Sequence, residues 1–126
     1  MDQNLSLDLS SIFSIIVGGT FGLILRIFIQ DNLRIKIFFN IQNTSIINFI
    51  ASFFLGIFVA LNFPNYSFFY IGFLGCFSTF SSFIYQLFIL YKKKKFLYLF
   101  FHYIEVICIS FICFYLGYFL IRSILR

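Results

Sequence analysis

The stretch GFLGCFSTFSSF, Gly72 to Phe83, decides the fold expected for this chain. It lies inside a hydrophobic run long enough to cross a membrane, yet it holds two glycines, four hydroxyl residues and four phenylalanines. Non-helical backbone at membrane depth is tolerated only where protein or a cavity satisfies its amides and carbonyls. A break in this helix therefore predicts a site, because its freed carbonyls can hold a cation.

The composition of the chain predicts an all-helical integral membrane protein. The 126 residues are 62% hydrophobic and 10% charged, with a mean hydropathy of +1.03, which leaves too little polar surface for a water-soluble fold. Apolar runs approach or exceed the ~20 residues that a spanning helix needs, at about 12–30, 44–63, 66–91 and 96–121. We expect four transmembrane helices in one domain, 1–126, with the third helix broken near its middle.

The distribution of basic residues predicts the orientation of the chain. Cytoplasmic loops carry the excess of lysine and arginine, and the first and third connections hold six of them: Arg34, Lys36 and Lys92–Lys95. The other face has Arg122 and Arg126. Both termini are therefore expected outside the cytoplasm. Recognition of specific membrane lipids is a second interpretation of the lysine run, and topology is the favoured one.

The first span combines small residues with a charge. Gly18, Gly19 and Gly22 recur at helical spacing, which is typical of closely packed membrane helices. Arg26 allows two interpretations: a guanidinium near a helix end that snorkels to the headgroups, or a positive potential at an anion vestibule.

A polar row runs along the second span. Thr44, Asn48, Ser52 and Gly56 recur every four residues and so share one helix face. Such a row is commonly interhelical hydrogen-bond glue. Asn48 lies deeper, however, and its amide can donate to an anion. The row therefore also suits the wall of a pore.

Aromatic and hydroxyl residues follow the predicted break. Phe80 and Phe83 are three positions apart and share a face, beside Ser81 and Ser82. A phenyl ring has an electropositive edge. Two rings turned edge-on could contact a small anion, although base composition alone could account for much of the phenylalanine content.

The fourth span has three polar members, His102, Glu105 and Ser110. His102 and Glu105 lie near the lysine run, so solvation at the interface is the expected state of both. The spans hold no other carboxylate, which argues against ion-coupled carriers and carboxylate catalysis. The sequence also lacks a Ser-His-Asp set, a phosphate loop and an HExxH motif. Neither an enzyme nor a nucleic-acid-binding protein is expected.

The three cysteines are expected to be small core residues. Cys76, Cys108 and Cys113 lie within predicted spans and have neither CxxC spacing nor nearby histidine partners.

Three motifs resemble those of the CrcB/Fluc family of small fluoride channels. They are GGTFGLILR (Gly18–Arg26), TSIINFIASFFLG (Thr44–Gly56) and GFLGCFSTFSSF. Their order and spacing within a four-helix chain make the resemblance specific. It implies a passive channel that exports cytoplasmic fluoride, in the bacterial plasma membrane.

The resemblance also implies roles for individual residues. Asn48 corresponds to the pore asparagine, Phe80 and Phe83 to the phenylalanines that line the fluoride path, and Arg26 to the arginine at the pore entrance. The hydroxyl residues placed beside the pore are Ser81, Ser82 and Ser110.

A structural sodium ion is the implied cofactor. In the family it binds backbone carbonyls at the break, which by similarity are those of Gly75 and Ser78. The family forms antiparallel dimers with two pores, each built from both subunits.

The chain departs from the family pattern at several positions. Cys76 replaces a glycine of the break, Gln86 stands where a glutamate is usual, and His102 and Val106 stand where many members have tyrosine and serine. Ser78, Ser82 and Ala51 are smaller departures. The departures at His102 and Val106 put the contribution of the fourth helix to a pore in doubt.

The lysine bias favours a heterodimer. A homodimer with subunits inserted both ways needs nearly balanced loops, whereas six basic residues against two favour one orientation. The partner expected is a homologous subunit of opposite orientation. Two alternatives stay open: a non-conducting assembly subunit, and a small four-helix exporter, which would need a glutamate absent from the first span.

Overall fold

The computed structural model describes residues 8–32, 43–62, 64 and 66–126, and every element in them is helical. The elements are α1 (Leu9–Asn32), α2 (Asn43–Ala60), the π-helix η1 (Ser67–Leu74), α3 (Gly75–Phe77), α4 (Phe80–Lys92) and α5 (Phe96–Ile124). The basic residues expected in the first connection, Arg34 and Lys36, lie outside the described residues.

Three helical stretches are long and apolar enough to span a membrane. They are Leu9–Asn32, Ser67–Lys92 and Phe96–Ile124, with 24, 26 and 29 residues. The remaining apolar helix, Ser45–Ala60, is shorter. It ends before the expected residue 63, because the chain turns at Leu61 and Asn62, where Asn62 has a positive φ of 50°.

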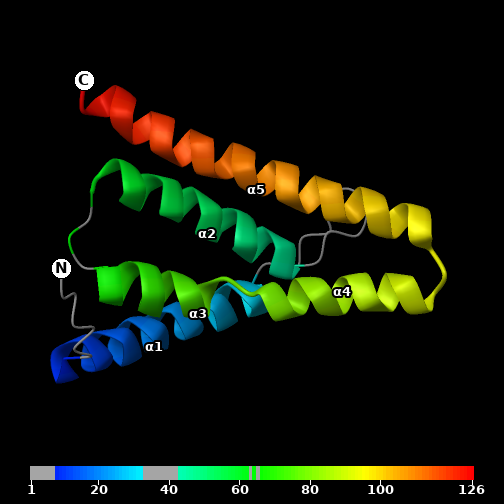
Figure 1. Cartoon of the computed structure of the whole chain (residues 1–126), viewed down its shortest axis with the longest axis horizontal. Helices are drawn as coiled ribbons and strands as arrows, with labels where there is room; N and C mark the ends of the chain where they lie inside the picture. Colours follow the sequence, from blue (N-terminus) through cyan, green and yellow to red (C-terminus); the bar gives the residue numbers. More distant parts are fainter. Residues whose placement is uncertain (1–7, 33–42, 63, 65) are drawn as a thin grey trace, which may run out of the picture.

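The helices pack as two pairs that run side by side, α2 with α5 and α1 with η1 (Figure 1). Glycines allow the backbones to meet. A Cβ on Gly56 would overlap the carbonyl of Phe114, and one on Gly117 would overlap the carbonyl of Phe53. A glycine from each helix therefore allows α2 and α5 to pack in direct backbone contact.

The α1–η1 pair uses glycines in the same way. A Cβ on Gly18 would overlap the Phe68 carbonyl, and one on Gly22 would overlap the Phe73 carbonyl. From the other side, a Cβ on Gly72 would lie 2.7 Å from the Ile15 carbonyl oxygen. The prediction that the glycines of the first span serve helix packing is confirmed.

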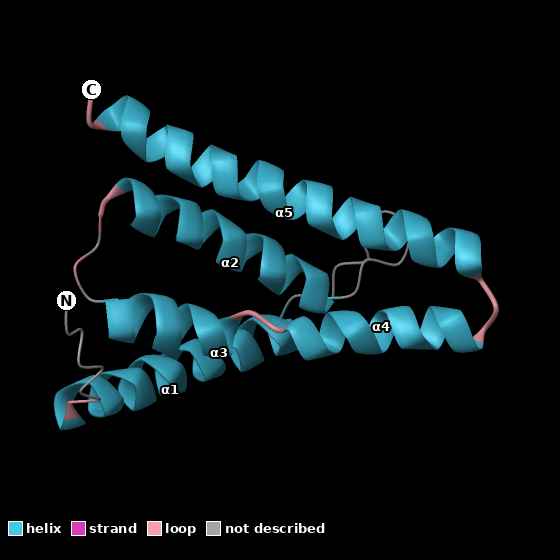
Figure 2. Cartoon of the chain, in the orientation of Figure 1, coloured by secondary structure: helices cyan, strands magenta, loops and turns pink. Residues whose placement is uncertain are grey.

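The helical path is interrupted between α3 and α4. Ser78 has φ −74° and ψ 156°, and Thr79 has φ −143° and ψ 107°, so both are extended. Figure 2 shows this segment as a loop between two helices. Beside it lies the buried apolar cluster of Ile47, Ala51, Leu74 and Phe77.

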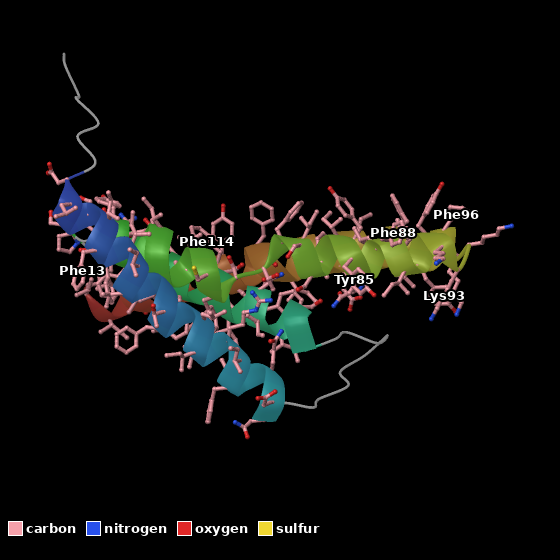
Figure 3. The ribbon with its side chains drawn as sticks, turned by 90° about the horizontal axis from the view of Figure 1, so that it is seen from below. Phe13, Tyr85, Phe88, Lys93, Phe96 and Phe114 are labelled. Carbon is pink, nitrogen blue, oxygen red and sulfur yellow. The ribbon has the colours of Figure 1, made fainter. Side chains whose placement is uncertain are left out.

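Beyond the interruption, α4 and the first half of α5 form a helical hairpin that ends in the lysine turn. Figure 3 shows side chains such as Tyr85, Phe88 and Phe96 standing out from this hairpin, with Lys93 at its end. All three aromatic side chains are exposed. A surface of this kind suits lipid or another membrane helix rather than water.

The cysteines do not lie in the core of the chain. Cys76 and Cys108 are exposed and Cys113 is half-buried. The expectation of core positions is therefore wrong for Cys76 and Cys108. The reason is that a membrane protein has apolar residues on its outside as well as its inside, so hydrophobic surroundings in the sequence do not indicate burial.

Candidate functional site

The extended residues between α3 and α4 are held by a side chain of α2. Asn48 Nδ2 donates to the Thr79 carbonyl at 3.0 Å, and the Thr79 amide donates to Asn48 Oδ1 at 2.8 Å. Both backbone groups of Thr79 are thus satisfied by one amide side chain, as membrane depth requires. We call this two-point contact the Asn48 clamp.

The clamp changes the bonding of the helix that precedes it. In a continuous helix the Thr79 amide would donate to the carbonyl of Gly75, four residues earlier. Here the amide is directed to Asn48 instead. The Gly75 carbonyl is thereby released from its usual helical donor.

Thr79 also caps the start of α4. Its Oγ1 accepts from the Ser82 amide at 3.3 Å, which is the usual role of an N-cap threonine, and donates to Ser82 Oγ at 3.0 Å. Ser81 Oγ lies 3.4 Å from the same oxygen. The structure therefore gathers Ser81 and Ser82 around Thr79, beside the clamp.

A groove of about 390 Å³ opens against the interruption. Its lining residues are Asn48, Ala51, Ser52, Leu55, Tyr70, Leu74, Gly75, Ser78, Thr79 and Phe80. No acidic or basic side chain is among them. Gly75 leaves this side open, because a Cβ there would meet only the Tyr70 carbonyl oxygen, at 4.0 Å.

The two phenylalanines lie together but in different surroundings. The ring centroids of Phe80 and Phe83 are 6.3 Å apart, with 53° between the planes. Phe80 is 75% exposed and lines the groove, whereas Phe83 is only 7% exposed. Phe83 packs against α5, with its centroid 6.1 Å from that of Tyr103.

His102 differs from its expected state. It is buried, and its Nε2 lies 3.2 Å from Oε1 of Gln86, which is also buried. Solvation at the interface is therefore the wrong interpretation for His102, because α5 turns this side chain towards α4 and away from the outside. Glu105 is half-buried.

Two other predicted site residues lie apart from the clamp. Arg26 is half-buried on α1, and Ser110 is half-buried on α5. Neither lines the groove, and neither takes part in the hydrogen bonds described around Thr79. Their roles remain predictions.

Sequence reasoning did not single out as site residues three residues with buried polar side chains in or near this region: Ser45, Thr79 and Gln86. Thr79 carried a usable signal, since a hydroxyl residue just ahead of an apolar run is a helix N-cap pattern. The contact between Ser45 and Gln86 depends on packing between helices, because the two residues are 41 positions apart in sequence.

The fold and the site define a small helical membrane protein with an interrupted helix, whose polar backbone faces an uncharged groove beside aromatic rings. The family model described as "CrcB-like protein, Camphor Resistance (CrcB)" matches residues 13–118. The chain belongs to the CrcB family.

Two named relatives each cover 90% or more of the chain, and a third covers 72%. A "Fluoride-specific ion channel FluC 2" of Prochlorococcus marinus (strain MIT 9312) is 68% identical over 121 residues, or 94% of this chain and 99% of the relative. A protein of the same name from Prochlorococcus marinus subsp. pastoris (strain CCMP1986 / NIES-2087 / MED4) is 52% identical, over 90% of this chain and 95% of its own. A "Fluoride-specific ion channel FluC" of Thermococcus kodakarensis is 35% identical, over 72% and 79%.

Proposed function

We propose that this chain is a subunit of a passive, fluoride-selective channel that exports cytoplasmic fluoride. Family membership and the names of its relatives support this proposal. The observation that carries it is the Asn48 clamp at the interruption of a helix, followed directly in the chain by the neighbouring rings of Phe80 and Phe83. A channel of this kind carries out no enzymatic reaction.

A passive channel is sufficient for fluoride export. Fluoride enters as HF from acidic surroundings, dissociates in the more alkaline cytoplasm and is trapped as an anion. The negative-inside potential, about 2.3 kcal/mol per elementary charge per 100 mV, drives the anion out. No coupling ion is required, which fits a groove lined by no acidic side chain.

Hydrogen-bond donors and ring edges would replace the water of fluoride. An asparagine amide nitrogen carries two hydrogens, and the clamp uses one of those on Asn48. The other can donate to an anion. The edges of Phe80 and Phe83 and the hydroxyls of Ser81 and Ser82 would complete the path.

We also assign roles in this channel to Arg26 and Ser110. Arg26 would set a positive potential at the entrance, and Ser110 would supply a hydroxyl from α5. Chloride would be excluded largely by its size.

A sodium ion fits the residues at the interruption. The Gly75 carbonyl has lost its helical donor to the Asn48 clamp, and Gly75 and Ser78 both line the groove. Carbonyl oxygens suit this hard cation. Bound there, sodium would supply a fixed positive charge that holds the two halves of the interrupted helix together.

The assembly we propose is an antiparallel dimer in the bacterial plasma membrane, with both termini outside the cytoplasm. The excess of basic residues on one face supports pairing with a homologous subunit of opposite orientation. This bias also favours a second candidate function, a non-conducting partner subunit of such a channel.

Fluoride efflux from liposomes tests the channel. We expect voltage-driven fluoride release from liposomes that contain the purified chain together with its homologous subunit, and little chloride release. Robust fluoride flux from the chain alone would exclude the obligatory heterodimer.

Growth of a fluoride-sensitive strain separates the candidate functions. Loss of the gene should arrest growth at low fluoride if the chain contributes to a channel. An exporter of other compounds predicts normal growth. A subunit that only assists assembly predicts that Phe80→Ile and Phe83→Ile leave the flux unchanged.

A further inference from the structure

A buried polar cluster joins α2, α4 and α5 outside the proposed fluoride path. Ser45 Oγ donates to Gln86 Oε1 at 3.5 Å, and His102 Nε2 lies 3.2 Å from the same oxygen. Ser45, Gln86 and His102 are 2%, 6% and 8% exposed. Because an amide oxygen only accepts, His102 donates through Nε2. We call these three residues the Gln86 cluster.

The cluster matters because of where α4 begins. Two extended residues separate α4 from α3. The rotation of α4 about its own axis is therefore not set by α3. At its first turn the Asn48 clamp on Thr79 holds it. Gln86 is seven residues later, about two turns along. The clamp and the cluster are therefore two polar attachments on one side of α4.

Phe83 lies between these attachments. It is three residues before Gln86, which places the two on one face of α4, and it follows the N-cap Thr79 by four residues. Its ring centroid is 6.2 Å from that of His102. The imidazole that bonds to Gln86 is thus also a wall for the ring of Phe83.

We propose that His102 and Gln86 are positioning residues for Phe83. They fix the rotation of α4 about its axis and the orientation of the Phe83 ring. Together these direct an edge of the ring to fluoride. This inference rests on the proposed function. The orientation matters because the edge of a phenyl ring is electropositive and its face electronegative. Loss of the cluster should therefore lower selectivity for fluoride and not only the amount of folded protein.

The test compares fluoride and chloride efflux from liposomes for the wild-type complex and its variants. His102→Phe keeps a ring without the donor, and Gln86→Leu removes the acceptor. We expect each to lower fluoride flux roughly tenfold or more, as a rise of about 1.4 kcal/mol in the permeation barrier would, and to lower the fluoride-to-chloride ratio. Combined, they should cost no more than Gln86→Leu alone, because Gln86→Leu already removes the contact that His102→Phe removes.

A conservative pair supplies the rescue. His102→Tyr with Gln86→Glu keeps a ring, a donor and an acceptor, and should restore most of the flux and selectivity. Phe101→Leu, on the exposed side of the same turn of α5, is the matched control and should behave as the wild type.

Unchanged flux and selectivity in His102→Phe and Gln86→Leu would overturn the inference, as would flux losses that merely follow the amount of folded protein. If His102→Phe does not fold, Gln86→Leu and the conservative pair still decide. A wild-type complex without fluoride flux would instead refute the proposed function.

Discussion

Gly117 and Gly75 are both helical glycines of an apolar chain, and they serve opposite purposes. A Cβ on Gly117 would overlap the Phe53 carbonyl, so this glycine lets α5 touch α2. A Cβ on Gly75 would meet only one atom, 4.0 Å away. The glycines of the helix pairs allow two backbones to touch, whereas Gly75 leaves room for the groove at the interruption.

The comparison shows how this protein separates stability from function. In the α2–α5 and α1–η1 pairs, backbones pack directly against each other at glycines. At the interruption the helix is held by the Asn48 clamp and opens to a groove. Substitutions in the two regions should therefore fail in different ways.

The largest effect is expected at the closed pairs. Gly117→Val places two methyl groups beyond a Cβ that already overlaps the Phe53 carbonyl. Overpacking costs about 1–3 kcal/mol or more, and here backbone must move. We expect little folded protein after detergent extraction, measured by size-exclusion chromatography. Recovery of folded, active protein would show that the α2–α5 contact has room for a side chain at Gly117.

A smaller effect on folding, with a large effect on function, is expected at the clamp. Asn48→Leu leaves the Thr79 amide and carbonyl without partners, at about 1–3 kcal/mol for each group. We expect folded protein in reduced yield and loss of fluoride efflux from liposomes.

Asn48→Asp sharpens the test of the clamp. It keeps the acceptor for the Thr79 amide but removes both amide hydrogens, and it introduces a negative charge in the groove. Its yield should exceed that of Asn48→Leu while its fluoride flux stays low. Normal flux in either variant would remove Asn48 from the path.

Substitutions of Phe80 and Phe83 should likewise separate effects on function from effects on stability. Phe80→Ile and Phe83→Ile should each reduce fluoride flux and leave assembly intact. Because Phe83 is buried and Phe80 is exposed, only Phe83→Ile should also lower stability, by about 1 kcal/mol. Thermal denaturation in detergent measures the second effect. Unchanged flux in both variants would remove the rings from the mechanism.

The smallest effect on folding is expected at Gly75. Gly75→Ala adds one methyl group to open space and should change stability by no more than about 0.5 kcal/mol. If sodium binds here, the increase in melting temperature with added sodium should shrink relative to wild type. A loss of folding as severe as that of Gly117→Val would contradict the contrast between the two glycines.

Several features were predictable because they depend on local chemistry. Long apolar runs predict helices wherever they occur. The ends of all four runs lie within three residues of the helical stretches Leu9–Asn32, Asn43–Ala60, Ser67–Lys92 and Phe96–Ile124. The spacing of Gly18 and Gly22 predicted close packing, which the overlap of a Cβ with η1 explains. The shared face of Phe80 and Phe83 followed from their separation by three residues.

Other features were decided only by contacts between distant parts of the chain. Nothing near Asn48 in sequence indicates that both ends of its amide bind Thr79, 31 residues away. His102 was expected to be solvated at the interface because it lies near the lysine run, and it is buried because α4 and α5 face each other there. The sequence alone determines that the chain is a helical membrane protein, with glycine and hydroxyl residues that disfavour a regular helix within one span. Only the tertiary structure decides which side chains bond to the backbone groups there, because hydrogen bonds between helices depend on how the helices pack.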